Sequence, residues 1–226
     1  AGVAGGDGTA NSGVKLMISV GFGDTATGGF AEALVYGADN GAQISSNSWG
    51  YTSPGVYGQA ELDAIDYYNT KNGIVVFAAG NDNSESDFYP GFYDGVIAVA
   101  AVDVSGQRAG FSNYGDWIEI ASQGVNVHST MTSNSYGLAS GTSMACPHVA
   151  GVLALGWSAD PSLSKTDLLE CMYSTAADID PINGGYAGKL GAGMTDAEPF
   201  MQCVANGAPS TSPTVSKAPT TAAPSP

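Results

Sequence analysis

The chain has 226 residues, of which 43% are hydrophobic and 32 are glycine. This length and composition suit one domain with a buried core and argue against an intrinsically disordered chain. The net charge of -15, with only 6 lysine and arginine residues, disfavours nucleic acid and anionic membranes as partners, because both bind basic surfaces. The apolar runs are also too short to span a membrane.

Short apolar runs alternate with helical patterns in the first third of the chain. Residues 14–20 form an apolar run that predicts a buried strand, and residues 42–49 predict a second strand. The periodicity over residues 30–41 predicts a helix that ends near a glycine. Residues 59–73 predict another helix, which is expected to stop at Asn72-Gly73.

The remaining elements indicate the fold class. Residues 74–80 and 96–102 are continuous apolar runs, as expected for strands buried on both faces. Strands that alternate with helices predict a doubly wound α/β fold, in which a mostly parallel sheet carries helices on both faces. The other predicted elements are a strand at 117–121, a helix at 142–158, and two helices that start at capping boxes, Ser164 with Asp167 and Thr195 with Glu198.

The end of the chain and the three cysteines give separate predictions. Residues 207–226 consist almost entirely of Pro, Ser, Thr and Ala, which predicts an extended linker or an O-glycosylated stalk. Cys146 lies on an apolar helical stretch and is interpreted as a small buried hydrophobe rather than a reactive thiol. Cys171 and Cys203 lie in the last two predicted helices, and the sequence leaves open whether they are bonded.

The stretch "SGTSMACPHVAG" (140–151) places Ser143 before an apolar helix. Gly-Thr-Ser alone fits an ordinary helix cap. In the first turn, however, free N–H groups and the helix dipole favour negative charge, and the Ser143 N–H is placed to donate to an oxyanion. A serine hydroxyl still needs a base to become a nucleophile. Pro147 is expected within that first turn, where its missing N–H is not needed.

The stretch "VVFAAGNDN" (75–83) is a buried strand that ends at Gly80 and Asn81. An asparagine amide at the carboxyl end of a strand is able to donate a hydrogen bond to a tetrahedral intermediate. Taken alone, Gly80-Asn81 is equally typical of a turn.

Together these stretches resemble the subtilisin-like serine proteases, the subtilases of peptidase family S8. "SGTSMACPHVAGVLAL" is similar to the nucleophile helix of that family, and "VVFAAGNDN" to its oxyanion-asparagine strand. "SSNSWG" (45–50) resembles the strand that binds the substrate backbone, and the similarity extends from about residue 1 to residue 203. The resemblance implies a subtilisin-like fold and a serine endopeptidase, extracellular or at the cell surface, that acts as a monomer on extended polypeptides.

The resemblance also implies roles for individual residues. Ser143 would be the nucleophile and Asn81 the oxyanion donor. An edge next to the site would pair with an extended peptide through main-chain hydrogen bonds, although Trp49 fits core packing equally well. The residues of this edge are Ser48, Trp49 and Gly50. Those of the specificity pocket are Ala78, Ala79 and Gly80, with Phe88 at its far end. Tyr89-Pro90 matches a position where the family often has a cis peptide bond.

Neither histidine of the chain fits the catalytic base. In the family that histidine lies in His-Gly-Thr, at the start of a helix. The stretch "AGVAGGDG" (1–8) resembles the end of that helix. His128 and His148 match other positions, and Asp7 and Asp24 are out of order for the acid. The chain also begins with Ala rather than Met. We therefore expect the catalytic Asp and His and an amino-terminal strand to be missing, which leaves the peptidase domain (1–206) incomplete and inactive alone.

Two alternatives and one cofactor remain open at this point. The chain also fits a non-catalytic pseudoprotease or peptide-binding module on a glycosylated stalk. A two-chain enzyme cleaved after the start of the histidine helix is disfavoured, because the cut would fall inside a core helix. Subtilases often bind calcium, so an acidic loop is a candidate for a structural calcium ion, although a solvated loop fits the same residues: Asp82, Glu85, Asp87 and Asp94.

Overall fold

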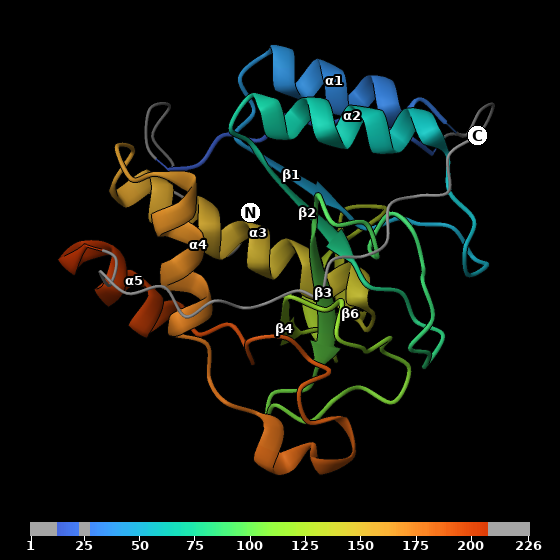
Figure 1. Cartoon of the computed structure of the whole chain (residues 1–226), viewed down its shortest axis with the longest axis vertical. Helices are drawn as coiled ribbons and strands as arrows, with labels where there is room; N and C mark the ends of the chain where they lie inside the picture. Colours follow the sequence, from blue (N-terminus) through green and yellow to red (C-terminus); the bar gives the residue numbers. More distant parts are fainter. Residues whose placement is uncertain (1–12, 23–27, 208–226) are drawn as a thin grey trace.

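The computed structural model describes residues 13–22 and 28–207. Four parallel strands form the central sheet in the order β1-β2-β3-β4 (Figure 1). The strands therefore follow one another across the sheet in chain order, and their carboxyl ends lie at one edge. They are β1 (Ile44–Asn47), β2 (Ile74–Ala78), β3 (Ile97–Val102) and β4 (Ile120–Gln123).

Helices cover both faces of this sheet (Figure 1). α1 (Phe30–Asp39) and α2 (Gln59–Thr70) pack on one face, and α3 (Thr142–Ala159) crosses the other. α4 (Lys165–Ser174) and α5 (Ala197–Asn206) pack against α3, and two short 3-10 turns, η1 (Asp180–Ile182) and η2 (Gly184–Tyr186), lie between them in the chain. The predicted doubly wound α/β fold is confirmed.

Strand β2 shows why its apolar run is continuous. Val75 and Phe77 belong to the apolar cluster formed with α1 and α2. Ile74 and Val76 belong to the cluster formed with α3. Because successive side chains of a strand point to opposite faces, a strand covered on both faces has no position for a polar residue.

The predicted strand at residues 14–20 is wrong. These residues form no strand, and Leu16, Ile18 and Val20 are 67%, 81% and 82% exposed. A strand becomes buried only when a neighbour pairs with its backbone and other elements cover its side chains. In the part of the chain that the structure describes, β1 is an edge strand that pairs only with β2, and nothing pairs with residues 14–20.

Two other predictions also need correction. The strand expected at 117–121 begins only at Ile120, and Trp117 and Ile118 are buried in the preceding turn. The antiparallel hairpin of β5 (Val127–Met131) and β6 (Ser135–Ala139) was not predicted. Its faces carry mostly exposed side chains, so the hydrophobic alternation that identifies a half-buried strand is missing.

The two predicted capping boxes have different outcomes. Ser164 caps α4 as expected, and its hydroxyl accepts from the Asp167 N–H at 3.0 Å. Thr195 does not cap α5. Asp196 is the cap, while both the N–H and the hydroxyl of Thr195 donate to the main-chain oxygen of Ala121 in β4. Thr195 is thus already committed to the sheet.

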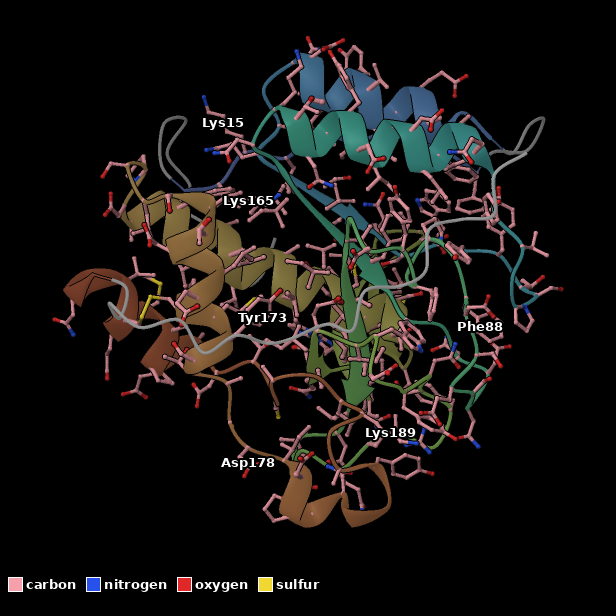
Figure 2. All side chains as sticks on the ribbon, in the orientation of Figure 1. Lys15, Phe88, Lys165, Tyr173, Asp178 and Lys189 are labelled. Atoms are coloured by element: carbon pink, nitrogen blue, oxygen red, sulfur yellow. A yellow bond between two sulfur atoms is a disulfide. The ribbon has the colours of Figure 1, made fainter. Side chains whose placement is uncertain are left out.

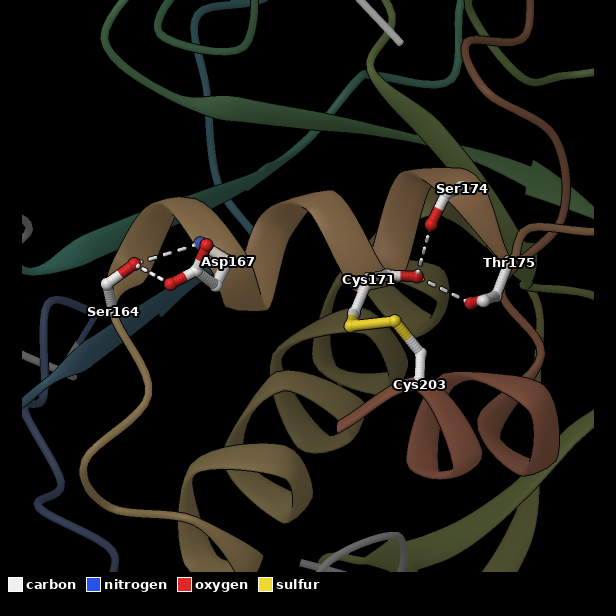
Figure 3. The surroundings of a disulfide bond; sticks show 6 residues. All are labelled: Ser164, Asp167, Cys171, Ser174, Thr175 and Cys203. Atoms are coloured by element: carbon white, nitrogen blue, oxygen red, sulfur yellow. Dashed lines mark hydrogen bonds between the residues drawn. A yellow bond between two sulfur atoms is a disulfide. The ribbon is translucent and has the colours of Figure 1, made fainter. Parts of the chain in front are cut away.

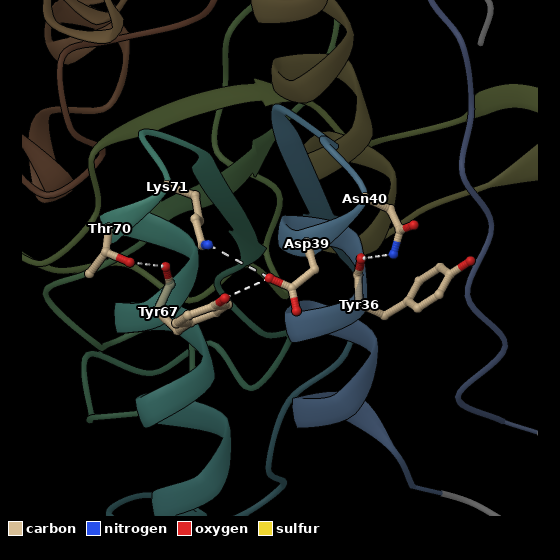
Figure 4. A network of polar contacts seen from close by, with 6 residues as sticks. All are labelled: Tyr36, Asp39, Asn40, Tyr67, Thr70 and Lys71. Carbon is tan, nitrogen blue, oxygen red and sulfur yellow. Dashed lines mark hydrogen bonds and ion pairs between the residues drawn. The ribbon is translucent and has the colours of Figure 1, made fainter.

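Side-chain contacts join the helices in pairs. Cys171 of α4 and Cys203 of α5 form a disulfide with a Cα–Cα distance of 5.6 Å (Figure 3), which settles a pairing that the sequence left open. Between the ends of α1 and α2, Asp39 accepts from the Tyr67 hydroxyl at 2.5 Å and pairs with Lys71 at 3.8 Å (Figure 4).

Several predictions fall outside the described residues. They concern the segment 1–8 with Asp7, the Asp24-Thr25 pair, and the stalk after Gly207. Within the described part, no helix combines the length and apolar character needed to cross a bilayer.

Candidate active site

Ser143 is the second residue of α3, which begins at Thr142 after the N-cap Gly141. The start of this helix lies beside the carboxyl ends of β1 and β2, because the residues that follow both strands contact it. The Ser143 side chain is half-buried. Among the described residues, its backbone N–H has no hydrogen-bond acceptor, as is usual in the first turn of a helix.

Asn81 follows β2 and is tied to the start of α3 by its side-chain oxygen. Asn81 Oδ1 accepts from the Thr142 N–H at 2.9 Å and from the Thr142 hydroxyl at 3.1 Å. The Nδ2 group makes no hydrogen bond to any described residue. The Asn81 Nδ2 group and the Ser143 N–H are therefore two donors that have no acceptor among the described residues.

Thr142 is a residue of this site that sequence reasoning did not select. Its side chain is fully buried, and its Oγ1 accepts from the Gly80 N–H at 3.1 Å while donating to Asn81. Thr142 thus links the end of the β2 loop to the first turn of α3. Its place directly before the predicted nucleophile was the only signal in the sequence.

Ser48 and Ser143 contact each other in both directions. The Ser48 hydroxyl donates to the Ser143 carbonyl oxygen at 2.9 Å, and the Ser143 hydroxyl donates to the Ser48 carbonyl oxygen at 3.5 Å. Pro147 explains why the carbonyl oxygen of Ser143 is available. It lies in the sixth position of α3, not in the first turn as expected, and it has no N–H for the oxygen four residues earlier.

The predicted substrate edge follows β1. Ser48 and Gly50 are exposed, whereas Trp49 is half-buried. The Trp49 ring stacks on Phe30 at 4.2 Å between centroids and meets Phe77 edge-on at 5.0 Å. The core-packing interpretation of Trp49 is therefore what the structure describes, and a contact with substrate stays a prediction.

The predicted pocket wall lies at the end of β2. Ala78 and Gly80 are partly exposed, and Ala79 is buried in an apolar cluster with Trp117. Phe88, which was expected at the far end of the pocket, is buried in the loop before β3 (Figure 2). In the same loop, the peptide bond between Tyr89 and Pro90 is cis, as predicted.

A cavity of about 400 Å³ lies elsewhere, at the amino ends of β2 and β3. Lys165 and Tyr173 of α4 line it together with Glu119 (Figure 2). Burial lowers the pKa of Lys165 and raises the pKa of Tyr173. None of the predicted catalytic or substrate-binding residues lines this cavity, and the carboxyl ends of the strands are where ligands bind in folds of this class.

Both histidines lie apart from the Ser143 hydroxyl. His148 of α3 has its Nδ1 2.9 Å from the Gln123 carbonyl oxygen and 3.0 Å from that of Met144. His128 stacks on Tyr136 in the hairpin. Within the described ranges, the only hydrogen bond of the Ser143 hydroxyl is the one to Ser48, so the structure supplies no base there.

One carboxylate of the acidic loop after Asn81 is used in an ion pair, because Glu85 pairs with Lys189 at 2.8 Å. Among residues 13–22 and 28–207, no three His, Cys, Asp or Glu side chains come together in a way that could hold a metal ion. The remaining thiol, Cys146, is buried as predicted.

Comparisons with known proteins show the family of the chain. The model of the subtilase family (peptidase S8) matches residues 1–206. A thermostable alkaline protease of Halalkalibacterium halodurans is 43% identical over 164 residues, which are 72% of this chain and 44% of that protein. Subtilisin Savinase of Lederbergia lenta is 34% identical over 186 residues, which are 82% of this chain and 65% of that protein.

A solved structure shows the same fold. The chain superimposes on the prenylagaramide maturation protease PagA with a TM-score of 0.69 at 25% identity, over 77% of this chain and 66% of that one. The chain spans less than two thirds of the length of both curated relatives. On its fold, its motifs and the match over residues 1–206, the chain belongs to the subtilase family.

Proposed function

We propose that this chain is part of a serine endopeptidase that cleaves peptide bonds through an acyl-enzyme on Ser143. The observation that carries the proposal is a pair of donors that have no acceptor among the described residues, Asn81 Nδ2 and the Ser143 N–H, on two segments that Thr142 holds together. Donors placed where negative charge develops stabilise the transition state of acyl transfer.

The chemistry follows from these groups. A base removes the Ser143 hydroxyl proton as Oγ attacks the scissile carbonyl carbon, and the carbonyl oxygen becomes an oxyanion. Asn81 Nδ2 and the Ser143 N–H donate to that oxyanion. The intermediate then collapses, the C–N bond breaks, and the protonated base returns its proton to the leaving amine. Water subsequently attacks the ester and regenerates the Ser143 hydroxyl.

The base and its orienting acid are proposed to come from polypeptide outside these 226 residues. The positions of His128 and His148 support this, because their rings contact the hairpin and the Gln123 carbonyl instead of the Ser143 hydroxyl. The exposed apolar run at 14–20 and the edge position of β1 support an incomplete sheet. In this proposal residues 1–206 form the incomplete peptidase domain and residues 207–226 a linker or stalk.

The proposed substrate is an extended polypeptide that pairs with the exposed backbone at Ser48 and Gly50. Ala78 and Gly80 leave room beside that edge for a substrate side chain. The enzyme is proposed to act as an extracellular or cell-surface monomer, in line with the secretion that is typical of subtilisins. A calcium ion is not needed for any step of this mechanism.

A second candidate is a non-catalytic peptide-binding module on a stalk. It is favoured by one observation, the absence of a base from the surroundings of Ser143 among the described residues. The two free donors count against it, because peptide binding alone does not require an oxyanion site.

Labelling with a fluorophosphonate separates the two candidates. The polypeptide that extends upstream of Ala1 should react at Ser143, and its Ser143→Ala variant should not. This 226-residue chain alone should react far more slowly, because a serine without a base is a weak nucleophile. If the polypeptide that extends upstream of Ala1 folds and binds peptide but is not labelled, the binding module would be established instead.

A further inference from the structure

Asn113 lies between β3 and β4 in the chain, and its side chain is 0% exposed. The side chain makes its hydrogen bonds to one loop, residues 79–84. Its Nδ2 donates to the Ala79 carbonyl oxygen at 2.9 Å. Its Oδ1 accepts from the Asp82 N–H at 2.9 Å and from the Ser84 N–H at 3.1 Å.

The main chain of Asn113 makes a fourth bond to the same loop. Its N–H donates to the Gly80 carbonyl oxygen at 3.0 Å. The loop therefore receives bonds on both sides of Asn81, at Gly80 before it and at Asp82 after it. Because buried backbone groups need partners, the Asn113 amide replaces the hydrogen bonds that a helix or strand would otherwise provide.

The loop backbone has a shape that depends on this contact. Gly80 has a φ of 101°, and a Cβ built there would lie 2.4 Å from Asn113 Nδ2. Asn83 has a φ of 51°, which ordinary residues seldom adopt. The loop thus wraps closely around one buried amide, and its conformation is set by that amide.

We propose that Asn113 is a positioning residue for the oxyanion donor. Thr142 fixes Asn81 Oδ1, and Asn113 fixes the backbone on either side of Asn81, so that together they determine where Nδ2 points. Asn113 itself touches no substrate. This inference rests on the proposed function, because only an oxyanion site gives the direction of that amide a purpose.

A double-mutant cycle tests the inference. It uses the longer polypeptide, which extends upstream of Ala1 and is proposed to supply the acid and base. Asn113→Ala should lower kcat on the order of tenfold or more with little change in KM, because small misplacements of a catalytic group are costly. In an Asn81→Ala background the same substitution should change kcat by less than about twofold, because no donor is left to position.

Ser112→Ala is the matched control. Ser112 is also fully buried, and its hydroxyl accepts from the Ala101 N–H and donates to the Asn113 carbonyl oxygen, away from the loop. It should lower stability without lowering kcat in this way. If Asn113→Ala does not fold, Asn113→Ser, which leaves a smaller gap, replaces it in the same cycle.

The outcomes are distinct. A kcat loss in the Asn81→Ala background equal to that in the wild-type background overturns the positioning role while leaving the proposed function intact. An unchanged kcat in folded Asn113→Ala does the same. A wild-type polypeptide that folds but shows no turnover overturns the proposed function, and this inference with it.

Discussion

Thr142 holds the Asn81 side chain by its oxygen atom, through its N–H at 2.9 Å and its hydroxyl at 3.1 Å. The Thr142 N–H can only donate, so the amide cannot rotate by half a turn without losing that bond and facing one donor with another. The orientation leaves the Nδ2 hydrogens free for a ligand. The residue beside the proposed nucleophile therefore sets the direction of the proposed oxyanion donor.

Replacing Thr142 with Val, in the polypeptide that extends upstream of Ala1, should slow the proposed peptidase and destabilise it. The hydroxyl bond to Asn81 disappears and the Gly80 N–H loses its acceptor. An unsatisfied buried N–H costs roughly 1–3 kcal/mol of unfolding free energy, and we expect kcat to fall on the order of tenfold. Steady-state kinetics and urea unfolding measure the two effects.

Thr142→Ser is the control for that experiment. It keeps the hydroxyl and removes only a methyl group, so kcat should stay close to that of the wild type. A Val variant as active as the Ser variant would show that the hydroxyl bond plays no part in orienting Asn81.

The bond from Ser48 to the Ser143 carbonyl should depend on Pro147. Pro147 cannot donate to that carbonyl, and Ser48 does so in its place at 2.9 Å. Ser48→Ala should therefore lower the free energy of unfolding by roughly 0.5–1.5 kcal/mol. In a Pro147→Ala background the residue at 147 gains an N–H for the same oxygen, so the cost of Ser48→Ala should shrink.

Chemical unfolding of the four variants gives the coupling between the two positions. An identical cost of Ser48→Ala in both backgrounds would mean that water already satisfies the carbonyl. The proposed dependence on Pro147 would then be wrong.

The elements that the sequence predicted well are apolar runs whose neighbours are present in the described part of the chain. β2 and β3 are such runs. Helices cover both faces of β2, while β3 packs against α3 on one face and against loop side chains such as Trp117 and Leu190 on the other. The run at 14–20 has a similar composition, but nothing in the described part of the chain pairs with it. A residue run predicts what is able to be buried, whereas burial itself needs a neighbour.

The site was only partly predictable for the same reason. Ser143 and Asn81 have recognisable neighbours in the sequence, and the structure brings the two segments together through Thr142. The contacts of Asn113 lie about thirty residues away along the chain, on the loop around Asn81. No local pattern marks a residue whose role consists entirely of such distant bonds. The β5–β6 hairpin was missed for a different reason: its mostly exposed strands have no buried face to produce an apolar pattern.

The disulfide should stabilise the domain without affecting catalysis. Cys171 and Cys203 are 32 residues apart and join α4 to α5, which supply none of the proposed site residues (Figure 3). Closing a loop of this length restricts the unfolded chain and contributes roughly 3–4 kcal/mol in the chain-entropy model.

Urea unfolding of the Cys171→Ala/Cys203→Ala variant should show this loss, while kcat of the folded variant stays unchanged at low temperature. Equal unfolding midpoints with and without the bond would contradict the prediction.

The Cys146 thiol should be unreactive in the folded protein. Burial raises its pKa from 9.0 to about 11, because the thiolate is poorly solvated in the core beneath β1 and β2. A group whose pKa is higher when folded favours the folded state while it stays protonated. Its contribution is therefore complete below pH 9.0 and is lost as the pH rises toward about 11.

A thiol reagent such as Ellman's reagent measures this directly. At pH 8 the native protein should release almost no thionitrobenzoate, and unfolding in guanidinium chloride without a reductant should release one equivalent, since the other two cysteines are bonded. Cys146→Ala is the control and should release none in either state. Rapid reaction of the native wild type at pH 8 would mean that α3 opens readily from the sheet, because Cys146 is reached only when α3 separates from β1 and β2.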